Sequence, residues 1–160
     1  MARDHFIAPT APTEAAVAVR LGAGSGSSNN LTQAEVNKFA KLVGESRYNL
    51  TAVGNEIEAV ITAVEIAPQN GFTIGAVQTG GMWNVTFDGL QATPGTGTIA
   101  IGDYVVTGTP VAKDTALTAP PKVCKATAAA TAIVFKWRVV SLGTAGTGAV
   151  GTAGVIQFVA

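Results

Sequence analysis

The sequence predicts a mainly β protein: a small β-barrel or β-sandwich with one short α-helix and an extended N-terminal arm. From residue 47 onward, apolar residues recur at every second position, which is the period of a strand with one buried face. Gly- and Pro-containing segments interrupt these runs at short intervals, as turns do. Only one segment, near residue 32, shows a helical period. Short strands between frequent turns are typical of sandwiches and barrels rather than of βαβ sheets.

The first thirty residues are expected to be separate from the folded domain. We predict an extended arm and a Gly/Ser linker over 1–30, followed by a domain over 31–160. Two prolines near the start favour extended backbone. The stretch VAVRL at 17–21 alternates as a strand does, so it could add to a sheet elsewhere. The linker GAGSGSSNN follows it directly. A disordered terminus is the alternative for the same residues.

Residues 32–43 carry the pattern of a short α-helix. Thr32 and Glu35 have the spacing of a capping box, in which the hydroxyl accepts an N–H of the first turn and the carboxylate reaches back to the cap. Gly44 stands where a left-handed C-cap belongs. A helix of about three turns is unstable alone, so its apolar face must pack on the sheet or on a neighbouring subunit. The residues that share this face are Val36, Phe39, Ala40 and Val43.

The rest of the chain is predicted to form strands. Gly80 and Gly81 indicate a hairpin between the predicted strands 72–78 and 82–89. Gly102-Asp103 indicates a bend or bulge within the predicted strand 98–109. AGTGAVGTAG connects to the uncharged last strand, whose edge needs a partner from barrel closure or from a neighbouring subunit. The predicted strands lie within 55–68, 72–78, 82–89, 98–109, 122–130, 132–143 and 155–159.

The composition restricts the classes of protein to which the chain can belong. Only 12% of the 160 residues are charged, ten basic and ten acidic, and the mean hydropathy is +0.36. Soluble proteins usually have about 25% charged residues. This chain is therefore either a membrane protein or a subunit that covers much of its exterior with neighbours. A spanning helix needs about 20 apolar residues, and glycines and polar residues interrupt both long uncharged runs, 66–87 and 139–160.

Other functional classes are also disfavoured. The balanced charge argues against nucleic-acid binding, which usually shows as a basic stripe. The N-terminus has no apolar core of the kind that marks a secretory signal, so we expect an intracellular product. A single cysteine excludes an intrachain disulfide. The sequence thus favours a subunit that assembles with protein partners and contacts neither membrane nor nucleic acid.

No active site is readable, and we expect no cofactor and no metal. The single histidine, His5, lies in the arm, which could not hold a catalytic base in place. Cys124 lies near Lys122 and Lys125, which could lower the pKa of its thiol, but no base accompanies it, so we interpret it as a strand cysteine. One histidine and one cysteine far apart do not make a zinc site.

Carboxylates and tryptophans are the remaining candidates. Glu56 and Glu58 would share a strand face and, with Glu65, could supply paired carboxylates, although a solvated strand face is the favoured interpretation. Trp83 and Trp137 on strands are predicted to be core or interface anchors. Their alternative role is a sugar platform in a carbohydrate-binding β-sandwich.

Three segments resemble the head decoration (cement) proteins of tailed bacteriophages. They are ARDHFIAPTAPTEAAVAVRL, IGDYVVTGTPVA and GTAGTGAVGTAGVIQFVA, in a chain with an arm, a linker, a short helix and a neutral β domain. The resemblance implies a non-enzymatic virion protein, made in the host cytoplasm. It would bind the outer surface of the expanded capsid and staple neighbouring major capsid proteins. It also implies a homo-oligomer, with a trimer favoured over a dimer, and leaves the role of the helix open.

The resemblance also implies two sets of contact residues. The arm would touch the capsid, and the β domain would form the oligomer surface or its core. A tail-tube or fibre-associated subunit is the alternative virion role. The arm positions are Phe6, Ile7, Val17, Val19 and Leu21, and the β positions are Trp83, Trp137, Ile156 and Phe158.

Overall fold

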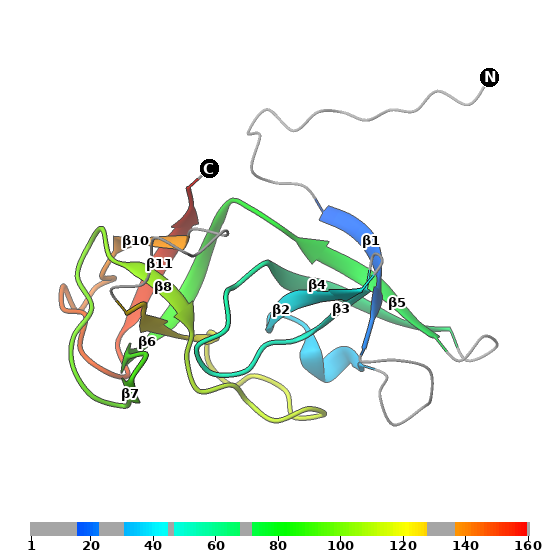
Figure 1. Ribbon diagram of the computed structural model, residues 1–160, viewed down its shortest axis with the longest axis horizontal. Helices are drawn as coiled ribbons and strands as arrows, with labels where there is room; N and C mark the ends of the chain where they lie inside the picture. The colour runs from blue at the N-terminus through cyan, green and yellow to red at the C-terminus, as the bar shows by residue number, and fades with distance from the viewer. Residues whose placement is uncertain (1–15, 23–30, 45–46, 68–71, 128–136, 160) are drawn as a thin grey trace, which may run out of the picture.

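The computed structural model describes residues 16–22, 31–44, 47–67, 72–127 and 137–159. The predicted class is confirmed, because the chain is mainly β and contains a closed barrel. Two β units lie beside each other, the first built by the N-terminal half and the second by the C-terminal half (Figure 1). A single 3-10 turn, η2 (Gln33–Glu35), is the only helical element in the described ranges.

The first unit is a closed five-stranded barrel in the order β1-β3-β2-β4-β5. Its strands are β1 (Ala16–Leu21), β2 (Phe39–Gly44), β3 (Arg47–Leu50), β4 (Ala59–Ala67) and β5 (Phe72–Gln78). The barrel is closed by β1, which runs antiparallel to β5 and parallel to β3. A Cβ atom on Gly75 would lie 2.2 Å from the Ala63 carbonyl oxygen, so the close approach of β4 and β5 requires glycine there. The buried apolar residues of this core are Leu21, Leu31, Ala40, Ala59, Ile61, Val64 and Val77.

The second unit is a sheet in the order β11-β10-β8-β9-β6-β7, and an additional pairing between β11 and β6 closes its five longer strands into a circuit. Its strands are β6 (Met82–Leu90), β7 (Thr93–Pro94), β8 (Tyr104–Thr107), β9 (Lys122–Lys125), β10 (Trp137–Ser141) and β11 (Ala153–Phe158). The predicted last strand therefore has both edges paired, with β10 and with β6. Its core is formed by Val85, Phe87, Ile99, Val105, Val123, Trp137, Val139 and Ile156.

The two units share one core across their seam. Phe39, Ile57 and Val60 belong to the first half of the chain but pack in the core of the second unit. The indole Nε1 of Trp137 donates a hydrogen bond of 2.8 Å to the Ile57 carbonyl, and both residues are fully buried. Backbone hydrogen bonds run from Gly54 to the Thr107 carbonyl and from the Thr107 amide back to residue 55. The seam is therefore joined by apolar packing and by hydrogen bonds.

The predicted helix over 32–43 is wrong. The capping box of Thr32 and Glu35 is present, but the turn it starts stops at once, because Val36 has extended ψ and Asn37 has φ 71°. The apolar residues after it form strand β2, in which Phe39 pairs with β4. Burial against a neighbouring strand overrides the weak helical preference of a short segment. Gly44 accordingly ends a strand and is not a helix C-cap.

The predicted hairpin between β5 and β6 is also wrong, although both strands exist. β5 pairs with β1 and β4, whereas β6 pairs with β7, β9 and β11. Gly81, at φ 91°, directs the chain from one unit into the other. The fourth predicted strand begins only at Tyr104, because the segment before it turns at Gly102, the predicted bend.

The boundary between arm and domain also differs from the predicted one. The alternating stretch at 17–21 is a strand, as predicted, but it pairs inside the barrel of its own chain. Ala16 lies opposite Gln78, and Leu21 is buried in the barrel core. The barrel therefore includes residues before 31, from Ala16 to Leu21. Residues 1–15 and the linker residues 23–30 lie outside the described residues.

Replacing Trp137 with Phe should destabilise the whole chain. The substitution removes the indole donor from the Ile57 carbonyl in a buried place, which costs about 1–3 kcal/mol. The free energy of unfolding from urea titration measures this loss. Trp83→Phe is the control, because Trp83 is half-buried and packs beside the same core without a hydrogen bond across the seam. Equal losses in the two variants would contradict a special role for the indole bond.

Candidate functional site

The connection between β8 and β9, residues 108–121, lies across the seam. Lys38 Nζ donates a 2.8 Å hydrogen bond to the Ala112 carbonyl, and the Asp114 amide donates a 2.5 Å hydrogen bond to Glu35 Oε1. At the other end of the connection, the Thr86 hydroxyl donates to the Pro120 carbonyl at 3.1 Å. The first unit thus holds the middle of a loop whose two ends belong to the second unit.

Glu35 and Lys38 form a buried ion pair at the base of this loop. Lys38 Nζ lies 3.4 Å from Glu35 Oε1, and neither side chain is more than 5% exposed. The second carboxylate oxygen accepts hydrogen bonds from the backbone amide and the hydroxyl of Thr32, at 2.5 and 2.9 Å. Burial raises the pKa of the Glu35 carboxyl, but the hydrogen bonds and the Lys38 charge outweigh burial and lower the pKa below its ordinary value.

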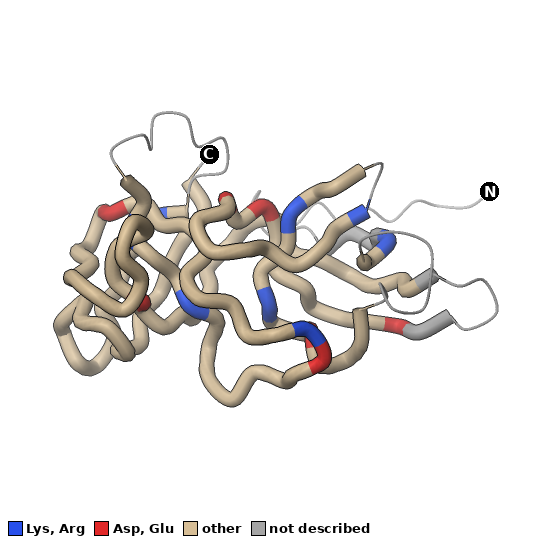
Figure 2. Tube along the Cα trace, turned by 60° about the horizontal axis from the view of Figure 1, so that its bottom comes forward, with Lys and Arg blue, Asp and Glu red and all other residues tan. Residues whose placement is uncertain are grey.

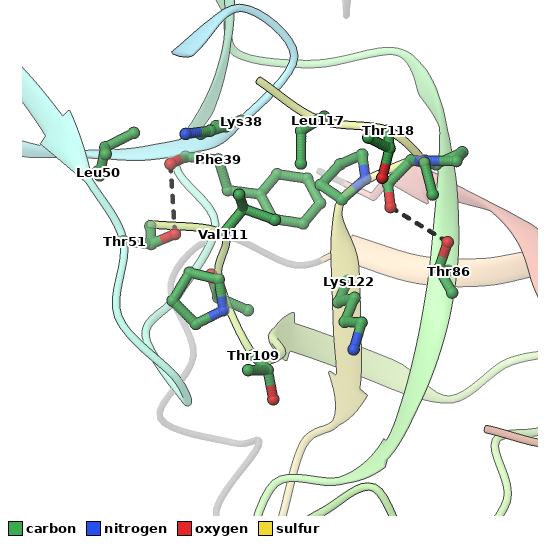
Figure 3. Close-up of a pocket in the computed structure, with 15 residues that line it drawn as sticks. Lys38, Phe39, Leu50, Thr51, Thr86, Thr109, Val111, Leu117, Thr118 and Lys122 are labelled. Atoms are coloured by element: carbon green, nitrogen blue, oxygen red, sulfur yellow. Dashed lines mark hydrogen bonds between the residues drawn. The ribbon is translucent and has the colours of Figure 1, made fainter. Parts of the chain in front are cut away.

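Two hollows flank the end of the same loop. The first is a cavity of about 140 Å³ between the loop and the seam (Figure 3). Phe39 projects into it between Val111 and Leu117, and Lys122 lies along its lower wall. Apart from Lys38 and Lys122, the wall consists of apolar side chains, prolines and threonines. This chemistry suits a small apolar group and includes no nucleophile with a partner base.

The second hollow is an open groove on the other side of residues 117–121. It is lined by Met82, Trp83 and Asn84 at the start of β6 and by Asn37 beyond η2. None of the lining side chains is charged. Asn37, Met82 and Asn84 are exposed, and Trp83 is half-buried.

The structure separates the four predicted β positions. Trp137 and Ile156 are fully buried in the core of the second unit, so neither can form a surface platform. Trp83 and Phe158 are partly buried against the same core. The rings of Trp137 and Phe158 meet edge to face with centroids 5.7 Å apart, an arrangement that stabilises aromatic pairs. Of the two tryptophans, only Trp83 faces a hollow in the described part of the chain.

The arm positions are divided in the same way. Phe6 and Ile7 lie outside the described residues, as does His5. Val17 and Val19 are on β1, opposite Val77 and Gly75 of β5. Leu21, also on β1, is 3% exposed in the barrel core, so it cannot reach a capsid.

Cys124 is a buried strand cysteine, as predicted. It lies on β9, where its Sγ is 3.6 Å from the Asp88 carbonyl oxygen. Burial, with a smaller contribution from the charge of Asp88, raises the pKa of the thiol to about 11, and the opposing effect of Lys122 is weaker. The environment thus disfavours the thiolate.

The predicted carboxylates do not form an acid–base pair on a strand. Glu56 and Glu58 precede β4 rather than lying on it, and Glu58 accepts a 2.8 Å hydrogen bond from the Leu42 amide. Glu65 is on β4 and exposed. Across the described ranges, no group of three His, Cys, Asp or Glu residues is placed to hold a metal ion. The same ranges contain no helix long and apolar enough to cross a membrane.

The surface carries large apolar side chains among few charges. Figure 2 shows the charged positions as short, separated segments along an otherwise uncharged trace. Met82 is 60% and Ile101 64% exposed. The other exposed large apolar residues in the described ranges are Leu42, Val43, Val53, Ile74, Leu90 and Val150.

Sequence reasoning missed the loop contacts and the groove. Glu35 was recognised as a capping residue, but its bond to the Asp114 amide joins residues 79 positions apart, which no local pattern reveals. No local pattern places Pro120 and Pro121 beside Trp83, which lies 37 positions before Pro120 in the chain. Comparisons with protein-family models, with curated proteins and with solved structures gave no match.

Replacing Glu35 with Gln should lower the free energy of unfolding by about 2 kcal/mol near pH 7, because several hydrogen bonds to a buried carboxylate weaken and Lys38 loses its counter-charge. The folded pKa is depressed, so the contribution is complete above the unfolded pKa of about 4.3 and is lost as pH falls through the folded value. Urea titrations at several pH values should show the gap between wild type and variant closing in acid. The exposed Glu65→Gln is the control, and a gap that persists unchanged in acid would contradict the charge assignment.

Native Cys124 should react slowly with iodoacetamide at pH 8. With a pKa of about 11, only about one thiol in a thousand is ionised, and burial hinders access further. The rate of alkylation, followed by mass spectrometry, should rise by orders of magnitude when the protein is unfolded in guanidinium chloride. Fast alkylation of the folded protein would show that β9 opens readily or that the thiol environment is different.

Proposed function

We propose that this protein is a non-enzymatic structural subunit that binds the outer surface of a tailed-bacteriophage head and holds neighbouring major capsid proteins together. The observation that carries the proposal is the surface of the folded body, on which large apolar side chains lie exposed among few charges. Exposed apolar groups in this setting favour contact with other proteins. The resemblance of three segments to head decoration proteins supplies the partner.

The closed sheets support a role in an ordered assembly. β1 to β5 form a closed barrel, and the pairing of β11 with β6 closes the second circuit. Unpaired strand edges promote indefinite pairing with other chains, and closure removes most of them. Association then has to use side-chain surfaces, which can be specific and limited in number. Repeated over a capsid lattice, many weak contacts of this kind give strong overall attachment.

The arm of the proposed function is shorter than the sequence suggested. β1 is part of the barrel, so the segment that we propose as the arm is 1–15. Fully extended, fifteen residues reach roughly 50 Å. Phe6 and Ile7 are the apolar side chains that this segment offers to a capsid subunit. The oligomer favoured by the resemblance, a trimer before a dimer, would use the exposed apolar residues of the body.

The competing virion role is a tail-tube or fibre-associated subunit, which would use the same neutral surface to stack into rings. The two roles differ in self-assembly. A decoration protein stays a small soluble oligomer until heads are present, whereas a tube protein polymerises into long hollow rods. Light scattering of the purified protein near neutral pH separates them: two or three chains per particle is the expected mass, and long polymers would favour the tube.

Deleting residues 2–15 should abolish binding to heads, because it removes the proposed arm. The barrel should stay intact, because the deletion ends before β1. Heads that lack the protein are incubated with full-length or shortened chain and then pelleted, and the bound protein is measured by gel densitometry. Urea denaturation checks that both chains unfold at the same midpoint. The double variant with Phe6→Ser and Ile7→Ser is the matched control for length, and it should also bind weakly. Undiminished binding of the shortened chain would refute the role of the arm.

A further inference from the structure

The groove between β6 and residues 117–121 has the features of a ligand site. Its volume is about 520 Å³, within the roughly 300–1,000 Å³ range of sites that hold small molecules. Trp83, Pro120 and Pro121 are among the residues that line it. It is separate from the seam cavity, with which it shares only the segment from Leu117 to Pro121.

The lining indicates a neutral ligand with an apolar face. No charged side chain lines the groove, so an ionic ligand would lose its hydration without gaining a counter-charge. Trp83 packs on the core of the second unit, is half-buried and is the aromatic residue among those that line the groove. A flat aromatic surface of this kind suits a ligand with a C–H face rather than an ionic group.

Polar groups around the indole are free to bind. Asn37 and Asn84 are exposed, and within the described part of the chain their side-chain amides make no hydrogen bond. Thr118 is exposed and its hydroxyl is likewise unpaired there. A side-chain amide both donates and accepts hydrogen bonds, so it can pair with a sugar hydroxyl that acts as acceptor or as donor. A groove lined by an indole, two amides and a hydroxyl is complementary in chemistry to a saccharide, whose rings have C–H faces and rims of hydroxyls.

Hydrogen bonds and strand pairing fix the backbone around the groove in the absence of a ligand. The backbone N–H of Asn37 donates a 2.7 Å hydrogen bond to the Ile61 carbonyl, and Asn37 has a φ of 71° in the turn between η2 and β2. Thr86 binds the carbonyls of both prolines, at 3.1 and 3.0 Å. Trp83 and Asn84 lie on β6, paired with β11. A preformed site loses little free energy in ordering its side chains on binding.

We propose that this groove binds a neutral oligosaccharide, with Trp83 packing against one sugar ring and Asn37 and Asn84 hydrogen-bonding hydroxyls elsewhere along the same saccharide chain. The site goes beyond attachment to a phage head and does not depend on it. On a virion surface it would face outward only if the opposite side of the body met the shell, but the binding itself is a property of the isolated chain.

Acrylamide quenching of tryptophan fluorescence tests the proposal on the full-length protein. Trp137 is 0% exposed, so quenching reports Trp83 almost alone. The probes are cellohexaose, maltohexaose and chitohexaose, each titrated to on the order of 10 mM, the range of weak sites. Decaproline is the comparison probe, because an aromatic groove beside prolines could instead take a proline-rich peptide. At least one hexasaccharide should protect Trp83 saturably.

Two variants keep the test independent of core packing. Asn84→Ala removes one amide from a strand, and Asn37→Gly removes the other while tolerating positive φ. Each should weaken saccharide binding roughly fivefold, the effect of one hydrogen bond. Ile101→Ala, at a residue 64% exposed and outside the groove, is the control and should bind as wild type does.

Three outcomes would overturn the proposal. They are the absence of protection by all three hexasaccharides, protection by decaproline alone, and saccharide binding that Asn37→Gly and Asn84→Ala leave unchanged. Saturable protection by a hexasaccharide that both variants weaken supports it. Head binding by wild type and by these variants is measured in parallel. Loss of saccharide binding with intact head binding shows that the two functions fail separately.

Discussion

The hydrogen bond from the Trp137 indole to the Ile57 carbonyl is the contact on which the rest of the structure depends. It joins a residue of β10 to the segment that leads into β4, 80 positions away in the sequence. Phe39 and Val60 pack in the same core from the first unit. If the indole donor were removed, the buried Ile57 carbonyl would be left unpaired, and this would cost more free energy than the hydrogen bond itself contributes. The core packing that buries the carbonyl therefore requires the donor. The residues that hold the loop over the seam, Glu35 and Lys38 of the first unit and Thr86 of the second, lie on the two units that this junction joins.

The loop over the seam adds an electrostatic constraint to the apolar one. Glu35 and Lys38 are buried, and their charges are tolerable only because each has partners from the loop as well as from the other. If the loop left the seam, the carboxylate and the ammonium would lose those partners while remaining largely desolvated. The ion pair therefore makes the loop conformation specific, and the loop in turn forms a wall shared by the cavity and the groove.

The class of fold could be predicted from the sequence, because a two-residue period survives in each strand and glycines separate the strands. The pairing of the strands could not. Gly80 and Gly81 are equally compatible with a hairpin and with a crossing between units, and only the distant partners of β5 and β6 decide between them. The prediction of a helix over 32–43 was wrong for a related reason. The capping box of Thr32 is visible in the local sequence, whereas the pairing of Phe39 with β4 depends on residues far along the chain. Of the candidate site, Trp83 was singled out from the sequence and Asn84 is its neighbour in the chain, but only folding placed Asn37 and residues 117–121 beside them.

Both the proposed attachment to a head and the groove use surfaces held by the seam, so the two closed sheets must behave as one body. Differential scanning calorimetry of the full-length protein tests this most directly, by comparing the calorimetric enthalpy of unfolding with the van't Hoff enthalpy. A shared core predicts a single transition in which the two enthalpies are equal. Two resolved transitions, or a van't Hoff enthalpy near half the calorimetric value, would mean that the units unfold independently and that the seam does not join them.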